Sequence, residues 1–340
     1  MSASRNPLLA VTATVAGAAL NLVDVPMRAL QRALGVPRIG WMFVAPNLLI
    51  LGLFTFLPIV INFYFAFSGG VELYPSQRPL TGLDNLETLF DCGNYLDPST
   101  CRQDIFWRAI YNTAFFAVVQ VGLMVSFALI TALVLNRKII GRGFFRGVFF
   151  YPVLLSPVVV ALIWKWMLQR EGVLNALMVA AGAAPVEWLT QGHWAFFWSV
   201  FVSIWAHMGF YTLILLAGLQ AIPADVYEAA EMDGATPWRR FSRITLPLLM
   251  PNLVVVLVLG MIRAVQVFDE VFVLTGGGPG SATTFIVQYI YQTGFAEAIH
   301  QYGLAAAASL VLALSLLLLT LVQLRLTNKT LAGKGGRDDG

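Results

Sequence analysis

Six long apolar segments dominate this chain of 340 residues and leave it few folds to adopt. They cover residues 41–67, 109–135, 148–168, 193–219, 253–274 and 302–324. About 20 apolar residues in a helix cross the hydrocarbon core of a bilayer, where each backbone N–H and C=O must be paired within the helix. The chain is 58% hydrophobic and only 11% charged, which is too little charge for the surface of a soluble domain. We therefore predict an all-α integral membrane protein with six spanning helices.

Residues 1–40 are interpreted as a separate N-terminal extension. The apolar stretch from Leu8 to Val23 is barely long enough to span a membrane, and Asp24 and several arginines follow it directly. It only weakly resembles a signal peptide, so we predict an amphipathic helix lying on the membrane. The transmembrane domain then covers residues 41–325, and residues 326–340 form a flexible tail.

The basic residues predict the orientation of the chain in the membrane. Four lie in residues 1–40, four in 136–147, three in 221–250 and four in the C-terminal tail. The loops on the other side carry four: Arg78, Arg102, Arg108 and Arg170. Short loops rich in Lys and Arg stay in the cytoplasm, so both termini and residues 221–250 are predicted to be cytoplasmic.

Residues 221–250 form a charged interruption between the fourth and fifth apolar segments, and we call them the elbow. Pro223 suits the first turn of a helix, and Gly234 is placed to end that helix in the left-handed conformation. Thr236 and Pro237 then read as the N-cap and first residue of a second helix. The elbow is therefore predicted to be two short helices joined by a bend.

The end of the second elbow helix is predicted from two prolines. Pro247 and Pro251 are expected to stop that helix at the point where the chain re-enters the membrane. The small residues Ala229 and Ala230 leave room on the first helix for the close approach of another protein.

Several function classes are excluded by what the sequence lacks. It has no phosphate-binding Gly-x-x-x-x-Gly-Lys-Ser/Thr loop, no His-Glu-x-x-His and no Gly-x-Ser-x-Gly, so no catalytic residue is predicted and a membrane-embedded enzyme is disfavoured. Three histidines and two cysteines do not supply the usual metal-ligand spacings, and a net charge of +3 does not indicate nucleic acid. Cys92 and Cys101 share one polar loop, either as a disulfide or as two free thiols.

The elbow carries a recognisable motif. Glu228-Ala-Ala230, three residues, Gly234, nine residues and Ile244-x-Leu246-Pro247 resemble the cytoplasmic signature of permease subunits of bacterial ABC importers. The rest of residues 40–325 resembles the carbohydrate-uptake branch, with its maltose-type and glycerol-phosphate-type permeases. Supporting matches are Asn112–Thr113, Arg146, Pro152, Trp164–Trp166, Phe268–Asp269, Leu274–Pro279 and Tyr302–Ala307.

This resemblance implies a set of partners in the bacterial inner membrane. They are a second permease, a dimer of ATP-binding subunits that hold ATP and Mg²⁺, and an extracytoplasmic substrate-binding protein. The branch favours a heterodimer of permeases, although one sequence leaves a homodimer open. The loop from Thr275 to Pro279 either contacts the binding protein or is a purely structural turn.

The resemblance also assigns the elbow to contact with the ATPase, with Glu228 as the polar anchor and Gly234 as the bend. The residues expected at this contact are Tyr227, Glu228, Ala229, Ala230, Asp233, Gly234 and Arg240. The alternative is a solvated elbow that supports only its own helix bundle.

Polar residues within the spans indicate a substrate pathway, because buried polar groups in a membrane are costly and tend to face a cavity or another helix. In the fourth span these residues share one face: Ser203, His207, and Phe210 or Tyr211. In the fifth span Arg263 and Gln266 share a face, with Asp269 and Glu270 one turn further. Aromatic faces beside hydrogen-bonding groups suit a sugar ring.

Two structural alternatives stay open for these residues. His207 would then bond to a neighbouring span, and Arg263 would pair with Asp269 or Glu270 or bind backbone carbonyls. For the cargo, the sequence predicts a sugar, with glycerol phosphate, a polyol or a phosphorylated, sulfonated or acidic sugar as alternatives.

Overall fold

The computed structural model describes residues 35–137 and 139–335, and all regular elements in these ranges are helices. Five helical segments are long and apolar enough to cross a membrane: Phe43–Ala66, Asp104–Asn136, Gly192–Gln220, Pro237–Val265 and Tyr302–Arg325. A sixth span results if the bent pair Arg142–Leu154 and Pro157–Met167 counts as one. The predicted all-helical membrane fold is confirmed. Most of the N-terminal extension, residues 1–34, and residues 336–340 lie outside the described residues.

The chain divides into two compact units, residues 1–64 and 65–340. In the first unit, α2 (Val36–Leu51) leads through a wide π-helical turn (Gly52–Phe56) into α3 (Leu57–Ala66). Pro46 lies inside α2, and the apolar side chains of this span are exposed along most of its length. A helix that is apolar on all sides needs lipid or another helix around it.

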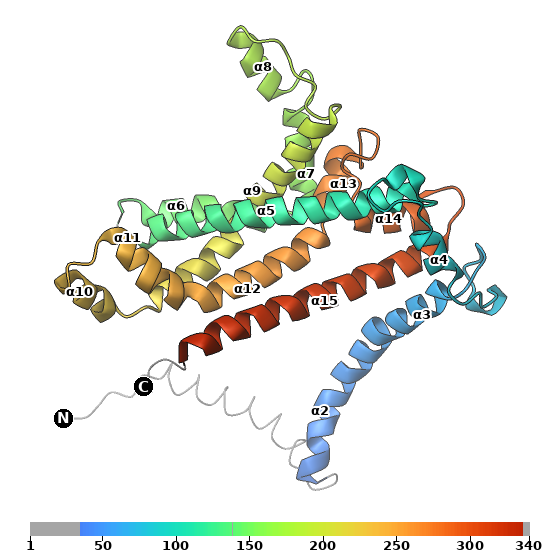
Figure 1. The fold of residues 1–340 in the computed structure, drawn as a ribbon, viewed down its shortest axis with the longest axis horizontal. Coiled ribbons are helices and arrows are strands. Elements are labelled where there is room, and N and C mark those ends of the chain that lie inside the picture. Colours follow the sequence, from blue (N-terminus) through green and yellow to red (C-terminus); the bar gives the residue numbers. More distant parts are fainter. Residues whose placement is uncertain (1–34, 138, 336–340) are drawn as a thin grey trace, which may run out of the picture. The chain divides into compact units, whose positions relative to one another are not determined.

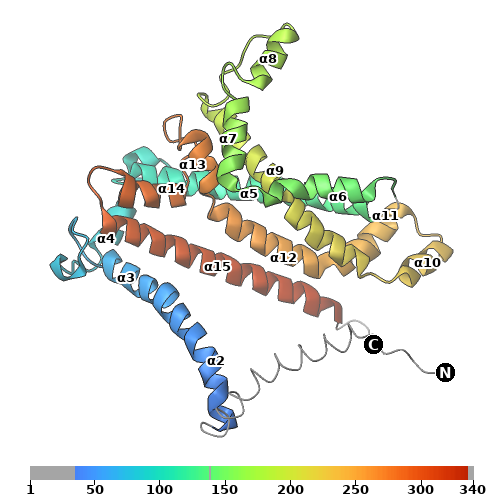
Figure 2. The same ribbon diagram turned by 180° about the vertical axis from the view of Figure 1, so that it is seen from behind.

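The core of the second unit lies between α5 (Asp104–Asn136), α9 (Gly192–Gln220) and α12 (Leu246–Val265), which run side by side (Figures 1 and 2). Small residues let the helices approach closely. A Cβ added at Gly218 of α9 would lie 2.5 Å from Asn252 Cγ, and one added at Gly260 of α12 would lie 2.7 Å from Met124 Cε. Gly218 therefore lets α9 and α12 pack closely, whereas the contact at Gly260 is with the flexible end of Met124, which can move.

The third span is broken. The sequence predicts one interrupted helix over residues 148–168, whereas α6 (Arg142–Phe150), a short 3₁₀ turn (Tyr151–Leu154) and α7 (Pro157–Met167) follow each other with a bend of 100°. Pro152 and Pro157 lack the N–H groups that would continue the helix, so the predicted interruption is confirmed, and the change of direction is added by the fold.

The fifth span begins and ends elsewhere than predicted. Pro247 and Pro251 do not stop the elbow's second helix, because a π-helical turn (Phe241–Thr245) leads from α11 (Pro237–Arg240) directly into α12 and Pro251 lies inside it. Pro247 falls in the first turn of α12, where its missing N–H is tolerated. At the other end α12 stops at Val265, and α13 (Asp269–Thr275) is a separate helix, so the predicted span 253–274 is wrong.

Three short helices lie in the segments that join the predicted spans. They are α4 (Asp84–Phe90), α8 (Val173–Ala180) and α14 (Ile286–Tyr291), the last continued by a π-helical turn (Gln292–Ala296). Two 3₁₀ turns (Pro75–Gln77 and Pro98–Thr100) also lie there, and α15 (Tyr302–Gly335) continues past residue 324. Runs of four to eight residues in polar loops carry too little periodicity to reveal such helices.

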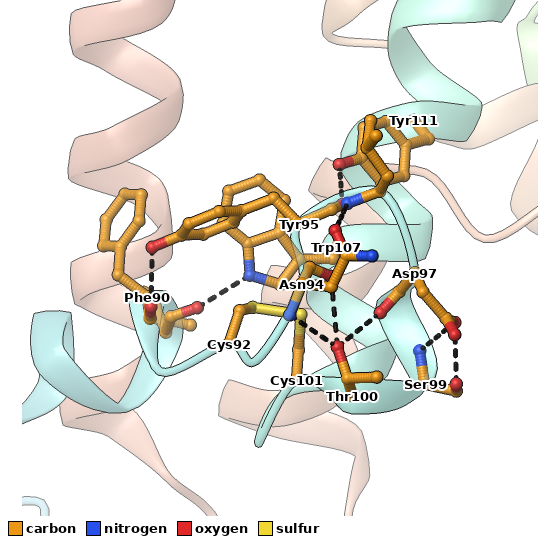
Figure 3. Close-up of a disulfide and its surroundings, with 12 residues drawn as sticks. Phe90, Cys92, Asn94, Tyr95, Asp97, Ser99, Thr100, Cys101, Trp107 and Tyr111 are labelled. Carbon is orange, nitrogen blue, oxygen red and sulfur yellow. Dashed lines mark hydrogen bonds between the residues drawn. A yellow bond between two sulfur atoms is a disulfide. The ribbon is translucent and has the colours of Figure 1, made fainter.

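Cys92 and Cys101 form a disulfide that closes the loop between α4 and α5 (Figure 3). The closed loop is held against aromatic side chains: Tyr95 donates from its hydroxyl to the Phe90 carbonyl at 3.0 Å, and its ring lies 5.0 Å from that of Trp107. The Ser99 hydroxyl and backbone N–H both donate to Asp97, and they lower the pKa of that carboxyl.

Candidate functional site

The elbow has the predicted helix-bend-helix structure. Its first helix, α10 (Ala224–Met232), is followed by Gly234 with φ of +69°, the left-handed conformation that favours glycine. Thr236 caps α11 by accepting from the Arg239 N–H at 3.3 Å, and Pro237 is its first residue. Pro223 is the N-cap of α10 and lies one residue before the predicted first turn.

The predicted ATPase-contact residues lie on the outside of this elbow. None of residues 224–240 is buried, and Glu228, Ala229, Asp233 and Gly234 are exposed while Ala230 is half-buried. Tyr227 bonds through its hydroxyl to the Thr245 hydroxyl at 3.0 Å, and Arg240 pairs with Glu231 at 2.9 Å. The elbow therefore presents a polar surface that the described part of the chain leaves uncovered.

The elbow lies at one end of the helix bundle. Figures 1 and 2 place α10 and α11 at the end opposite α4 and α14. The disulfide-closed loop follows α4, so the elbow and the disulfide lie at opposite ends of the long helices.

A polar cluster joins α9, α12 and α13 within the bundle. Arg263 Nη2 lies 2.6 Å from His207 Nε2, and His207 Nδ1 lies 2.8 Å from the Ser203 carbonyl oxygen. Since a guanidinium only donates, Nε2 accepts and Nδ1 carries the hydrogen. Ser203 donates from its hydroxyl to Glu270 Oε1 at 3.2 Å, and that oxygen lies 4.0 Å from His207 Nδ1.

Two adjoining cavities of about 290 and 380 Å³ open beside this cluster. Both are lined by Phe210, Tyr211 and Arg263, the first also by His207, and the second also by Gln266, Asp269 and Glu270. The predicted pathway residues therefore line these spaces, except for Ser203, which is buried behind His207. The arrangement offers aromatic faces beside donors and acceptors, the chemistry that a sugar ring needs.

The break between α12 and α13 changes the predicted arrangement in the fifth span. Gln266 is the C-cap of α12, and Asp269 and Glu270 stand in the first turn of α13, where negative charge is favourable. Glu270 is buried, and it belongs to the cluster more closely than Asp269. The signal for Glu270 in the sequence was a carboxylate within a segment that is otherwise apolar.

The structure shows which contacts His207 and Arg263 make among the described residues. His207 does bond to a neighbouring helix, through Arg263. Arg263 does not pair with Asp269 or Glu270: no carboxylate lies within 4.0 Å of it in the part of the chain that the structure describes.

Asn112 and Thr113 have a structural role that the sequence did not reveal. Asn112 Nδ2 donates to the Ser281 carbonyl at 2.8 Å, and the Thr113 hydroxyl accepts from the Ile286 N–H at 2.9 Å. They fix the segment before α14 to α5.

Among residues 35–137 and 139–335, no group of three or more His, Cys, Asp or Glu side chains could hold a metal ion.

Comparison with known proteins decides the family. Residues 124–331, more than half of the chain, match the family described as "binding-protein-dependent transport system inner membrane component". The chain belongs to this family. The permease is 37% identical to the trehalose/maltose transport system permease protein MalF of Thermococcus litoralis, a match that covers 85% of this chain and 93% of the relative.

Two further comparisons support the same family. The permease is 33% identical to the lactose transport system permease protein LacF of Rhizobium radiobacter, over 84% of this chain and 92% of that one. A solved bacterial ABC transporter involved in the import of the acidic polysaccharide alginate has a chain that covers 88% of this one, with 99% of its own length matched, a TM-score of 0.74 and 26% identity. The permease is thus a multi-pass inner-membrane transport subunit of the sugar ABC importer family and not an enzyme.

Proposed function

We propose that this permease moves a sugar or sugar derivative into the cell by alternating access, and that a separate ATPase drives it through the elbow. The observation that carries the proposal is the polar cluster of Ser203, His207, Arg263 and Glu270 beside cavities with aromatic walls. Relatives named for trehalose/maltose and lactose transport support a sugar as cargo. A polyol would fit the same donors and acceptors.

The partners follow from this proposal. The exposed elbow receives the ATPase dimer, which binds ATP and Mg²⁺, and a second, different permease completes the membrane pathway. An extracytoplasmic binding protein delivers the sugar, and a solved alginate transporter in complex with a periplasmic protein supports that partner. The disulfide supports the orientation, since disulfides persist in oxidising compartments and the elbow lies at the other end of the bundle.

Glu228 and Glu231 offer a matched test of coupling, because both are exposed on α10 and lie three residues apart. In the assembled importer reconstituted in liposomes, Glu228→Ala should reduce ATP-driven maltose uptake at least about tenfold. Glu231→Ala should stay within about twofold of the unmodified importer, because it loses only an exposed ion pair. Equal uptake by the two variants, or a Glu228→Ala importer that transports normally, contradicts the proposed contact.

A second candidate cargo is an anionic sugar or glycerol phosphate. The specific observation is Arg263, whose guanidinium faces both cavities and is bonded to the His207 imidazole instead of a carboxylate. A bound acid group would supply the missing anion with bidentate hydrogen bonds. The resemblance to an importer of the acidic polysaccharide alginate supports this candidate.

Uptake of two probes by the reconstituted importer separates the two cargoes. If the substrate is anionic, Arg263→Ala should lower uptake of a uronic-acid disaccharide at least about tenfold more than uptake of maltose. Arg263→Lys, which keeps the charge, should recover part of it. A ratio of the two uptake rates that stays unchanged in Arg263→Ala excludes the anionic cargo and leaves the neutral sugar.

A further inference from the structure

Two arginines converge on one amide at the elbow end of the bundle. Arg142 and Arg146, one turn apart on α6, donate from their Nη2 atoms to the side-chain oxygen of Gln220 at 2.9 and 2.7 Å, with the Gln220 amide oriented to accept both bonds. Gln220 is the last residue of α9, four residues before α10 begins. Figures 1 and 2 show α6 beside α9 and on the same side of the molecule as α10 and α11.

The described part of the chain offers no carboxylate that pairs with these two arginines, since none lies within 4.0 Å of either guanidinium. The Nε atoms of both arginines are shielded from solvent and have no hydrogen-bond partner among the described residues. The C-terminus of α9 contributes a partial negative charge of about half a unit, which leaves most of two positive charges uncompensated among the described residues.

The opposite face of α6 is apolar and exposed. Phe144 and Val148 lie four residues apart on that face, and Tyr151 follows it one turn later; they are 72%, 51% and 61% exposed. An exposed apolar face on a membrane protein contacts acyl chains. Helix α6 therefore presents fixed cations on one face and a hydrocarbon-compatible surface on the other, at the start of a spanning segment.

We propose that Arg142 and Arg146 bind the phosphate of an anionic phospholipid in the cytoplasmic leaflet, at the end of α6 where the apolar spanning segment begins; the choice of leaflet rests on the proposed orientation. Phosphate oxygens accept the paired N–H groups of guanidinium with good geometry, and basic sites between spanning helices suit anionic headgroups. The place of the two arginines at the membrane boundary favours a lipid phosphate over a free phosphate in solution. The site is distinct from the sugar pathway and does not depend on which cargo is carried.

The site is tested on the full chain purified in detergent, by native mass spectrometry with added lipid. Dioleoylphosphatidylglycerol should bind at least about tenfold more tightly than dioleoylphosphatidylcholine, and the Arg142→Gln, Arg146→Gln double variant should lose that preference. Arg137→Gln is the matched control, because Arg137 is exposed in the same basic loop and has no bond to Gln220. The affinity of this control variant for dioleoylphosphatidylglycerol should stay within about twofold of that of the unmodified chain.

Other outcomes overturn the proposal. Equal losses in the control and the double variant would mean diffuse attraction to the basic loop. Displacement of the lipid by millimolar inorganic phosphate would mean a free-anion site, and unchanged lipid binding in the double variant would mean that no site exists there. If the double variant does not fold, the Arg142→Lys, Arg146→Lys variant keeps both charges without the guanidinium fork, and it should bind phosphatidylglycerol more weakly than the unmodified chain; equal binding contradicts the proposal.

Discussion

The two connections that flank α9 are built in opposite ways. The segment before it, residues 168–191, folds around the buried side chain of Asn175. Asn175 Nδ2 donates to the Val186 carbonyl at 2.9 Å, and its oxygen accepts from the Val186 N–H at 2.9 Å and from Trp188 Nε1 at 3.1 Å. The segment after it is the elbow, in which no residue from 224 to 240 is buried.

The difference lies in what holds each connection in shape. Trp188 packs against Trp194 and Trp198 at ring distances of 5.0 and 5.8 Å, so the first connection has an apolar core and a satisfied polar centre. The elbow instead keeps its shape through local caps, while Met232 and Trp238 stay 90% and 74% exposed. Exposed apolar side chains do not separate the two connections, because Leu177 before α9 is also 66% exposed; the buried polar centre does.

The largest expected effect comes from removing the polar centre of residues 168–191. Asn175→Ala leaves the Val186 N–H and Trp188 Nε1 buried without an acceptor, at a cost of about 2–4 kcal/mol to the local structure. Amide hydrogen exchange in residues 168–191 should become roughly a hundredfold faster, while exchange in the elbow stays unchanged.

Asn252 provides the control for this variant, since its one long hydrogen bond to the Ile214 carbonyl measures 3.4 Å. Asn252→Ala should leave exchange in residues 168–191 unaltered. Unchanged exchange there in Asn175→Ala would remove the contrast between the two connections.

An intermediate effect is expected from the elbow's bend. In Gly234→Ala the added Cβ meets no atom within 4 Å, so only the left-handed backbone conformation is penalised, by about 1 kcal/mol. ATP-driven uptake by the assembled importer should fall about fivefold if the bend sets the contact with the ATPase. Gly122→Ala is the control, because Gly122 lies inside α5 and its Cβ would also be free of contacts. Equal uptake by both variants would show that the bend angle is unimportant.

The smallest effect is expected at the ion pair that crosses the bend. Glu231 is 69% exposed and its pairing with Arg240 is screened by salt, so Glu231→Gln should change the stability of the elbow by less than about 0.5 kcal/mol. At high ionic strength, amide hydrogen exchange in residues 224–240 should be the same for the unmodified chain and the Glu231→Gln variant. A large change would indicate that the elbow depends on internal pairing and resembles residues 168–191 after all.

Local signals predicted the elbow well because each acts over a few residues. Gly234 ends a helix through its own backbone freedom, and Thr236 caps the next through one side chain. The prediction that the second elbow helix ends at Pro247 was wrong, because a π-helical turn just before this proline changes the hydrogen-bond pattern and the helix continues. The fold of residues 168–191 was not predicted. It depends on the hydrogen bonds of Asn175 with Val186 and Trp188, which lie 11 and 13 residues away along the chain.

The candidate pathway was predicted in part. Helical spacing placed Ser203, His207 and either Phe210 or Tyr211 on one face of α9. In the structure Ser203 and His207 belong to the polar cluster, and Phe210 and Tyr211 both line the cavities. The link between His207 and Arg263 spans 56 residues, and the break after Val265 redirects Glu270 towards Ser203. Neither follows from periodicity, which describes one helix at a time.

The amino-acid sequence is enough to predict an all-helical membrane protein, because backbone groups in a bilayer must be paired within each span and the apolar segments have the required length. It also predicts the elbow's two helices and bend, through caps and a glycine. The size of the bend in the third span, 100°, the partner of Arg263, and the convergence of Arg142 and Arg146 on Gln220 are visible only in the folded chain. Prolines predict the bend's place but not its angle, and the other two features depend on side chains from different helices meeting in space, which no local pattern encodes.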